Sequence, residues 1–300
     1  MKKKTYLFAL MAMALALGSC SDNENGIGGE ASKYITVSTN IGSMTRVATD
    51  ADGSQTFEEG DKISVYAWTG EATVAPETRE RVVNNAINKL TNGSWVSTPQ
   101  MLWKNNRDKH YFIGVYPTAA ISDLSAGEYT FDANKQTESD LLVAVNPDGL
   151  SYSADAQQTV PLTFTHVMAK LAVNLTYKNQ WGGIPTVEKV VVGNAAKEAT
   201  INYLTKVVTP STTAKEDFSL PEITENTKYV SVIIPQEEVK QLTIVIGGKN
   251  FVYDNGTPFK LESGKITTVN LEVGRDEIKL GDVKITNWED GSTFSGEALN

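Results

Sequence analysis

The sequence predicts an all-β fold, arranged as two antiparallel β-sandwiches in tandem. From Tyr34 onward, apolar and polar residues alternate with a period of two in short runs, which is typical of half-buried strands. Turn signals such as Asp52-Gly53 and Asn92-Gly93 separate these runs. No window shows a convincing helical period with capping residues. A chain of 300 residues is long enough for two domains, each with its own core.

The first predicted strand runs from Tyr34 to Ile41, with Ile35, Val37, Thr39 and Ile41 on one face and polar residues on the other. In the first half of the chain, further strands are predicted over 63–68, 111–116, 141–145 and 160–164. In the second half, strands are predicted over 187–192, 201–208, 229–234, 242–246, 251–253 and 266–273, and a last extended segment over 283–288 follows.

A change in the phase of the alternation near residues 165–166 predicts a bulge or a domain junction. Leu162 and Phe164 are apolar at even positions, whereas over 167–177 the apolar positions are odd. A shift of one residue turns every side chain to the other face of a strand. We therefore predict an N-terminal sandwich over 34–165 and a C-terminal sandwich with a terminal strand over 166–300.

Residues 1–19 have the features of a secretory signal. Three lysines precede an apolar run over 6–17, which is too short to span a membrane. The single cysteine follows in Leu17-Gly18-Ser19-Cys20, an ending that resembles the lipobox of bacterial lipoproteins. The resemblance implies cleavage before Cys20 and lipid on its sulfur, which would anchor the protein to a membrane. The alternative is an ordinary secretory signal with an accidental cysteine.

Residues 20–33 are polar and rich in glycine, a composition that predicts a flexible tether. Their start, Ser21-Asp22-Asn23-Glu24, resembles the acidic signal that sends Bacteroidetes lipoproteins to the outside of the outer membrane. A plain linker fits the same residues. The predicted location is the surface of the outer membrane.

Composition and motifs argue against several functions. The formal net charge of −9 disfavours nucleic acid as a partner. Only two histidines are present, and His166 is predicted to be a structural residue at the junction. The chain has no HExxH, CxxC, GxSxG or glycine-rich phosphate loop. Asp50-Ala51-Asp52-Gly53 matches part of a calcium loop, but it lacks the third acidic position. We predict no enzyme activity, no metal site and no cofactor.

Three segments carry a recognisable set of motifs. They are Thr45-Arg46 followed by Phe57-Glu58-Glu59-Gly60-Asp61-Lys62-Ile63-Ser64-Val65-Tyr66, then Asp140-Leu141-Leu142-Val143-Ala144, and then Leu162-Thr163-Phe164-Thr165-His166-Val167-Met168-Ala169-Lys170-Leu171. In order and spacing they resemble the fimbrillin-like (Mfa-like) lipoprotein family of Bacteroidetes, over nearly the whole chain. The resemblance implies two tandem transthyretin-like β-sandwich domains and a pilin subunit of surface fimbriae, whose partners are other pilin subunits.

The resemblance also implies an assembly mechanism. In this family a protease trims the N-terminal segment, and a strand of the neighbouring subunit fills the groove that the first strand leaves, a form of β-augmentation. Carried over to this chain, Arg46 is the candidate cleavage site, and an ordinary loop arginine is the alternative. The candidate donor strand is 283–288, with Val283, Ile285 and Trp288. Its alternative is an edge strand of the second domain.

A second function stays open, a monomeric surface lipoprotein that binds a glycan or a host protein through loops or aromatic side chains. The candidates for such a platform are Trp68, Trp95, Trp103, Trp181 and Trp288. Isolated tryptophans in β-sandwiches are more often part of a core.

Overall fold

The structure is a computed structural model that describes residues 33–42, 56–153 and 158–288. In the first half the strands are β1 (Thr36–Ile41), β2 (Lys62–Thr69), β3 (Val83–Thr91), β4 (Ser94–Thr98), β5 (His110–Tyr116), β6 (Gly127–Thr130), β7 (Leu142–Leu150) and β8 (Thr159–His166). In the second half they are β9 (Ala169–Tyr177), β10 (Val187–Ala196), β11 (Glu198–Asn202), β12 (Val207–Pro210), β13 (Lys215–Ser219), β14 (Glu222–Thr224), β15 (Lys228–Ile233), β16 (Gln241–Ile246), β17 (Lys249–Asp254), β18 (Lys265–Val273) and β19 (Ile278–Asn287).

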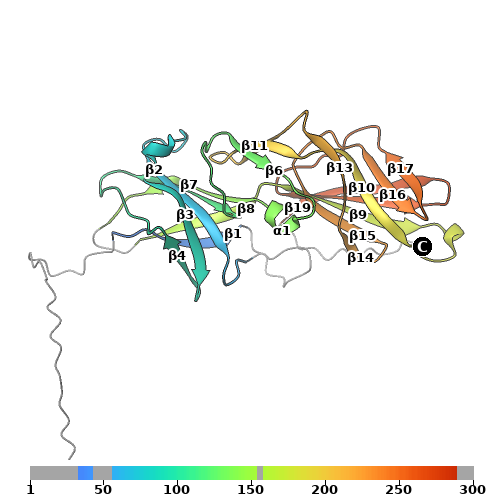
Figure 1. Cartoon of the computed structure of the whole chain (residues 1–300), viewed down its shortest axis with the longest axis horizontal. Helices are drawn as coiled ribbons and strands as arrows, with labels where there is room; N and C mark the ends of the chain where they lie inside the picture. Colours follow the sequence, from blue (N-terminus) through green and yellow to red (C-terminus); the bar gives the residue numbers. More distant parts are fainter. Residues whose placement is uncertain (1–32, 43–55, 154–157, 289–300) are drawn as a thin grey trace, which may run out of the picture.

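Helical structure in the described residues is limited to single turns, η1 (Thr78–Glu80), α1 (Gln136–Ser139) and η2 (Asn179–Trp181). The prediction of an all-β fold is therefore confirmed. The strands form four sheets, with the orders β1-β8-β7-β5-β2-β3-β4, β14-β15-β9-β18-β19, β13-β10-β16-β17 and β12-β11-β6. Figure 1 shows the seven-stranded sheet in one lobe and the five- and four-stranded sheets in the other.

The seven-stranded sheet curls until its two edge strands, β1 and β4, approach each other. Across this seam the indole Nε1 of Trp95 donates a hydrogen bond of 2.9 Å to Oγ1 of Thr39. Strand β2 lies in the middle of the sheet and is buried on both faces, as a central strand must be. Its Val65 faces the core inside the curl, and its Tyr66 faces a second core that continues into the other lobe.

The second lobe is a sandwich of the five-stranded and four-stranded sheets. Leu171 and Val173 of β9 share one buried cluster with Val190 and Val192 of β10. The change of phase near residue 165 lies where the chain passes from β8 in the seven-stranded sheet to β9 in the five-stranded sheet. A two-domain sandwich arrangement is consistent with this architecture.

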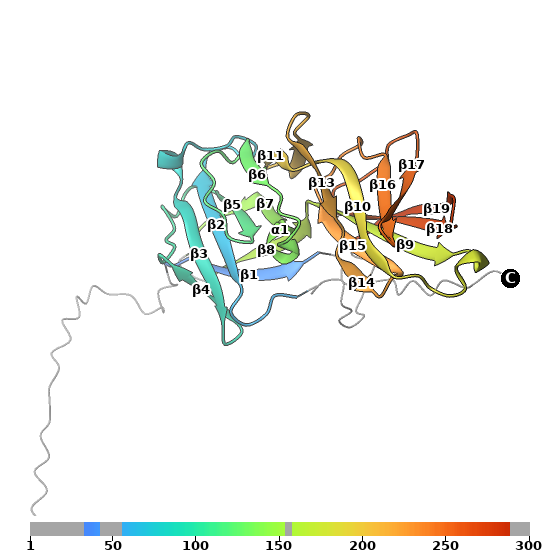
Figure 2. The same ribbon diagram turned by 45° about the vertical axis from the view of Figure 1, so that its right-hand side comes forward.

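Several contacts join the lobes, among them the pairing of two strands and a hydrogen bond from β15 to α1. Strand β6 of the first half pairs antiparallel with β11 of the second. In addition, the side-chain Oε1 of Gln136 in α1 accepts a 2.7 Å hydrogen bond from the backbone N–H of Val232 in β15. Figure 2 shows β6 and β11 side by side at the boundary between the lobes. The domain limits of 34–165 and 166–300 stay a prediction.

The structure differs from the predicted strands at 201–208 and at strands that were not predicted, namely β3, β4, β6, β13 and β14. The segment 201–208 was predicted as one strand, but it forms the hairpin of β11 and β12. Oδ1 of Asn202 accepts hydrogen bonds from the backbone N–H groups of Leu204 and Thr205, and this local bonding turns the chain. Strands β3 and β4, on either side of the Asn92-Gly93 turn, were missed because β3 contains three asparagines, which are depleted in strands.

Candidate functional site

Strand β1 fills a groove between β8 and β4, which we call the β1 groove. Its backbone pairs in parallel with β8, from Thr36 opposite Thr159 to Ile41 opposite Phe164. Its inward side chains are almost fully buried, since Ile35, Val37 and Ile41 are 2%, 6% and 8% exposed. They belong to the core inside the curled sheet. Strand β1 therefore completes this core from the edge of the sheet.

Thr39 is the one polar member of the inward row of β1, and its partner is Trp95. The rings of Trp95 and Phe57 pack in a T-shaped pair with centroids 5.3 Å apart, and those of Phe57 and Phe164 of β8 form another with centroids 5.1 Å apart. The indole N–H is thus held by aromatic packing and points at the hydroxyl that β1 supplies. Our sequence reasoning placed Thr39 on the inward face but missed this role. A lone polar residue in an otherwise apolar row is the signal that could have found it.

The predicted donor segment lies in β19, the edge strand of the five-stranded sheet. Val283 is opposite Val269 of β18, and Ile285 is opposite Thr267. The partners on β18 are fully buried, whereas Val283 and Ile285 are 38% and 40% exposed. Leu280, on the same side, is 37% exposed. The inner row of β19 is therefore only half covered by its own chain.

Trp288 and His166, both singled out in the sequence, meet at the end of β19. Their rings stack with centroids 4.2 Å apart and an interplanar angle of 9°. Nδ1 of His166 donates a 2.8 Å hydrogen bond to Oδ1 of Asp140, and Nζ of Lys170 lies 4.7 Å from the centre of the Trp288 ring. The backbone N–H of Trp288 donates to the carbonyl of Gly264. These contacts hold the end of β19 at the junction between the lobes.

Both ring nitrogens of His110 are hydrogen-bonded to the backbone, which is a structural role. Its Nε2 accepts a hydrogen bond from the backbone N–H of Lys104, and its Nδ1 donates to the carbonyl of Asp108. Burial lowers the pKa of His110, so the neutral ring that this pairing requires is favoured. Across residues 33–42, 56–153 and 158–288, no group of three or more His, Cys, Asp or Glu could hold a metal ion.

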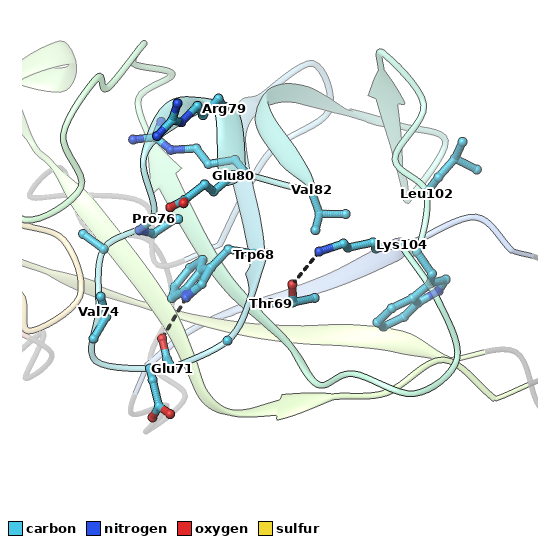
Figure 3. Close-up of a pocket in the computed structure, with 14 residues that line it drawn as sticks. Trp68, Thr69, Glu71, Val74, Pro76, Arg79, Glu80, Val82, Leu102 and Lys104 are labelled. Carbon is cyan, nitrogen blue, oxygen red and sulfur yellow. Dashed lines mark hydrogen bonds between the residues drawn. The ribbon is translucent and has the colours of Figure 1, made fainter.

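The five tryptophans do not form one platform. Trp68 and Trp103 line an open cleft of about 750 Å³, drawn in Figure 3. Trp68 is only 2% exposed, and its Nε1 donates to the carbonyl of Glu71. Trp181 packs against Phe251 in the second lobe. The cleft is lined by mixed residues, among them Val74, Glu80, Leu102 and Lys104, whose Nζ reaches Oγ1 of Thr69.

Several predicted features fall outside the part of the chain that the structure describes. They are the signal over 1–19, Cys20, the tether as far as residue 32, the acidic loop at 50–53 and Arg46. Arg46 lies in the segment between Gly42 and Thr56, which connects β1 to the rest of the first lobe. Within the described ranges, no helix is long and apolar enough to cross a membrane.

The protein is a two-lobed all-β protein. Its first and last described strands, β1 and β19, each lie at the edge of a sheet. The chain belongs to the fimbrillin-like family, whose model matches residues 45–288. No curated protein matches the sequence.

Solved structures share the fold at low sequence identity. A putative cell adhesion protein from Bacteroides uniformis is 19% identical, with a TM-score of 0.62, over 85% of this chain and 98% of that one. One from Bacteroides ovatus is 18% identical, with a TM-score of 0.62, over 86% and 98%. The tip fimbrial protein Mfa3 from Porphyromonas gingivalis is 11% identical, with a TM-score of 0.50, over 85% and 99%. At these identities the likeness concerns the fold.

Proposed function

We propose that the protein is a structural and adhesive pilin subunit of surface fimbriae, without enzyme activity. It is exported as a lipoprotein through Cys20 and assembles by strand exchange after a cut at Arg46. Membership of the fimbrillin-like family supports the pilin role. The observation that carries the mechanism is that β1 is a separable edge strand with a buried inner row, joined to β2 through the segment that contains Arg46.

A cut at Arg46 would leave β1 attached by non-covalent contacts alone. Its three buried aliphatic side chains contribute roughly 2 kcal/mol each by hydrophobic burial, and the ladder with β8 adds backbone hydrogen bonds. Loss of β1 exposes both the apolar floor of the β1 groove and the edge of β8. A strand from another subunit that restores the same contacts would be stabilised by the same forces.

The neighbour's β19 is the proposed donor. Its half-covered inner row gains burial when it enters a groove that excludes water. To donate, β19 must give up its pairing with β18 and the stack of Trp288 on His166. Strand β19 therefore either pairs with β18 of its own subunit or enters the β1 groove of a neighbour, and the β1 groove buries a strand more completely.

The test is N-terminal mapping by mass spectrometry of protein recovered from cells, with Arg46→Ala as the matched variant. The proposal predicts a start at Val47 in assembled species and ladders on non-reducing gels. It predicts an untrimmed, monomeric Arg46→Ala protein that starts at acylated Cys20. Assembly of Arg46→Ala as efficiently as the parent protein would contradict the mechanism.

The cleft of Trp68 and Trp103 favours a second candidate function, the binding of a host glycan or protein by a monomeric lipoprotein. A cleft of this volume has the size of a small-ligand site, and the ring of Trp103, which is half-buried whereas that of Trp68 is buried, would pack on the apolar face of a sugar. This function predicts an intact N-terminus at the cell surface and saturable binding that Trp103→Ala removes. Adhesion that persists in Trp103→Ala would count against the cleft.

A further inference from the structure

We propose that the cleft of Trp68 and Trp103 binds a sugar residue that carries a carboxylate, with the sugar ring on the indole of Trp103 and the carboxylate on Nζ of Lys104. The cleft is lined by residues 68–71, 74–76, 79–82 and 102–104. This inference rests on glycan binding, the second candidate function, and is independent of assembly into fimbriae. It names the class of glycan and the side chain that selects it.

The partner of the Lys104 ammonium is a neutral hydroxyl. Nζ of Lys104 donates a 3.2 Å hydrogen bond to Oγ1 of Thr69, which Figure 3 marks with a dashed line. Among the described residues, no carboxylate forms an ion pair with Lys104. An ammonium has three N–H donors, and a hydroxyl that accepts one bond can still donate its own proton. Lys104 and Thr69 together therefore offer donors to both oxygens of a ligand carboxylate.

The carboxylates that line the cleft do not face Lys104. Oε2 of Glu80 accepts a 3.1 Å hydrogen bond from the backbone N–H of Glu77, and Nε of Arg79 lies 2.8 Å from a carboxylate oxygen of Glu77. In Figure 3 the side chains of Glu71 and Glu80 point away from Lys104. The positive charge of Lys104 therefore acts on a bound anion without a competing carboxylate beside it.

One buried histidine positions both proposed contact residues. Nε2 of His110 accepts a 3.0 Å hydrogen bond from the backbone N–H of Lys104. The same ring forms a T-shaped pair with Trp103, with centroids 5.0 Å apart, and Phe112 forms another with Trp103 at 5.7 Å. These contacts hold the indole half-buried at the wall of the cleft. A ring held in this way loses little conformational freedom when a ligand packs on it, which favours affinity.

The opposite wall of the cleft is fixed as well. The guanidinium of Arg81 donates 2.6 Å hydrogen bonds to the carbonyls of Ile121 and Ser122. Nε1 of Trp68 donates a 2.9 Å hydrogen bond to the carbonyl of Glu71. Both walls are therefore formed before a ligand arrives, as is usual for small-ligand sites.

The lining favours a sugar acid over other anions. A sugar ring has an apolar face that can pack on an indole and hydroxyls at its edge that can bond to polar groups, and this cleft offers both kinds of contact. A fatty acid would need an enclosed apolar pocket, whereas this cleft is open. The formal net charge of −9 opposes a polyanion. A single carboxylate at Lys104 feels mainly nearby charges, because exposed charges are largely screened beyond about 8 Å at physiological ionic strength.

Titration followed by NMR tests the assignment with two matched pairs of ligands and uncut protein that carries Cys20→Ser. The first pair is the methyl glycoside of N-acetylneuraminic acid and its methyl ester, and the second is methyl glucuronide and methyl glucoside. We expect one acid or both to bind about tenfold more tightly than the neutral partner, because a charge-assisted hydrogen bond is lost with the charge. The indole N–H signal of Trp103, assigned from Trp103→Phe, should shift upon binding. The two pairs distinguish a sialic acid from a uronic acid.

Substitutions of lysines in the same loop complete the test. Lys104 is exposed, so Lys104→Gln should fold as the parent protein does. It should weaken binding of the acid about tenfold and change binding of the neutral partner less than about twofold. Lys104→Arg, which keeps the charge, should lose less than Lys104→Gln. The matched control is Lys109→Gln, because Nζ of Lys109 bonds to the carbonyl of Asp148 outside the cleft, and it should leave each affinity unchanged.

Each contrary result has a distinct meaning. Equal binding of an acid and its neutral partner would overturn the selection of a carboxylate and leave glycan binding intact. An unchanged preference for the acid in Lys104→Gln would overturn the assignment to Lys104. The absence of binding by all four ligands at millimolar concentration would overturn both this inference and the second candidate function, and would leave the role as a pilin subunit untouched.

Discussion

Strands β1 and β19 are both edge strands with an apolar inner row, but they are covered to very different extents. The inner row of β1 is at most 8% exposed at its aliphatic positions, whereas that of β19 is 37–40% exposed at Leu280, Val283 and Ile285. The difference arises because β1 lies in a seam closed on both sides, by β8 and by β4, while β19 pairs on one side with β18. Strand β1 lies in a groove that covers its inner row almost fully, whereas the inner row of β19 is only partly covered by its own subunit.

The largest difference in the free energy of unfolding is expected when a carboxylate is placed in the inner row of β1 and, separately, in that of β19. Val37→Asp places a carboxylate in the closed core and should lower the free energy of unfolding by roughly 3–5 kcal/mol. Ile285→Asp keeps its carboxylate near water and should cost about 1 kcal/mol. Urea titration at neutral pH measures both. Equal costs would remove the distinction between the two strands.

The next prediction concerns the anchor of β19. Trp288→Ala removes the ring that stacks on His166 and should cost about 2–3 kcal/mol, with Trp288→Phe retaining part of the stack. Hydrogen exchange should become faster in the amides of β19 and stay unchanged in those of β1. Faster exchange in both strands would mean that the two edges unfold as one unit.

A smaller effect on stability should show that the first lobe is packed more tightly at Gly114 than the second lobe is at Gly193. An added Cβ at Gly114 would lie 2.6 Å from Cζ of Phe164, inside the core beneath β1. Gly114→Ala should therefore cost about 1–3 kcal/mol by overpacking. The matched control in the second lobe is Gly193→Ala, where the nearest atom is the flexible side-chain Oε1 of Gln241 at 3.2 Å. A control that is as costly as Gly114→Ala would show that the core beneath β1 is not unusually tight.

The smallest predicted effect is on pH dependence, and it belongs to the first lobe. Burial lowers the pKa of His110, so the unfolded chain binds a proton at higher pH than the folded protein does. The contribution of His110 to stability is therefore present above its ordinary pKa of about 6.5 and is lost as the pH falls below that value. Urea titrations at several pH values should show a weaker acid dependence in His110→Phe. An unchanged dependence would exclude His110 as the cause.

The comparison also shows what the sequence could and could not predict. Strand β1 was predicted within two residues because its alternation is uninterrupted, and the same holds for the inner positions of β19. Strand β3 was missed because Asn85 has a positive φ at a register shift and Asn88 is buried on the core face. Neither position follows the alternation of a regular strand.

The features that bear on assembly depend on contacts between distant parts of the chain. The parallel pairing of β1 with β8, the bond from Trp95 to Thr39 and the stack of Trp288 on His166 each join residues that no local pattern relates. The alternation over 283–288 did indicate Val283 and Ile285, because alternation is a local pattern. Lipid attachment at Cys20 and cleavage at Arg46 stay predictions from resemblance.

The most direct test of the exchange of β1 for a neighbour's strand is intact-mass measurement of the species that form after a cut at Arg46. The account predicts that assembled subunits begin at Val47 and that the released segment carrying β1 is absent from them, while uncut protein stays monomeric. Assemblies that retain the cut segment in stoichiometric amount would contradict it, because the β1 groove would then still be occupied by its own strand.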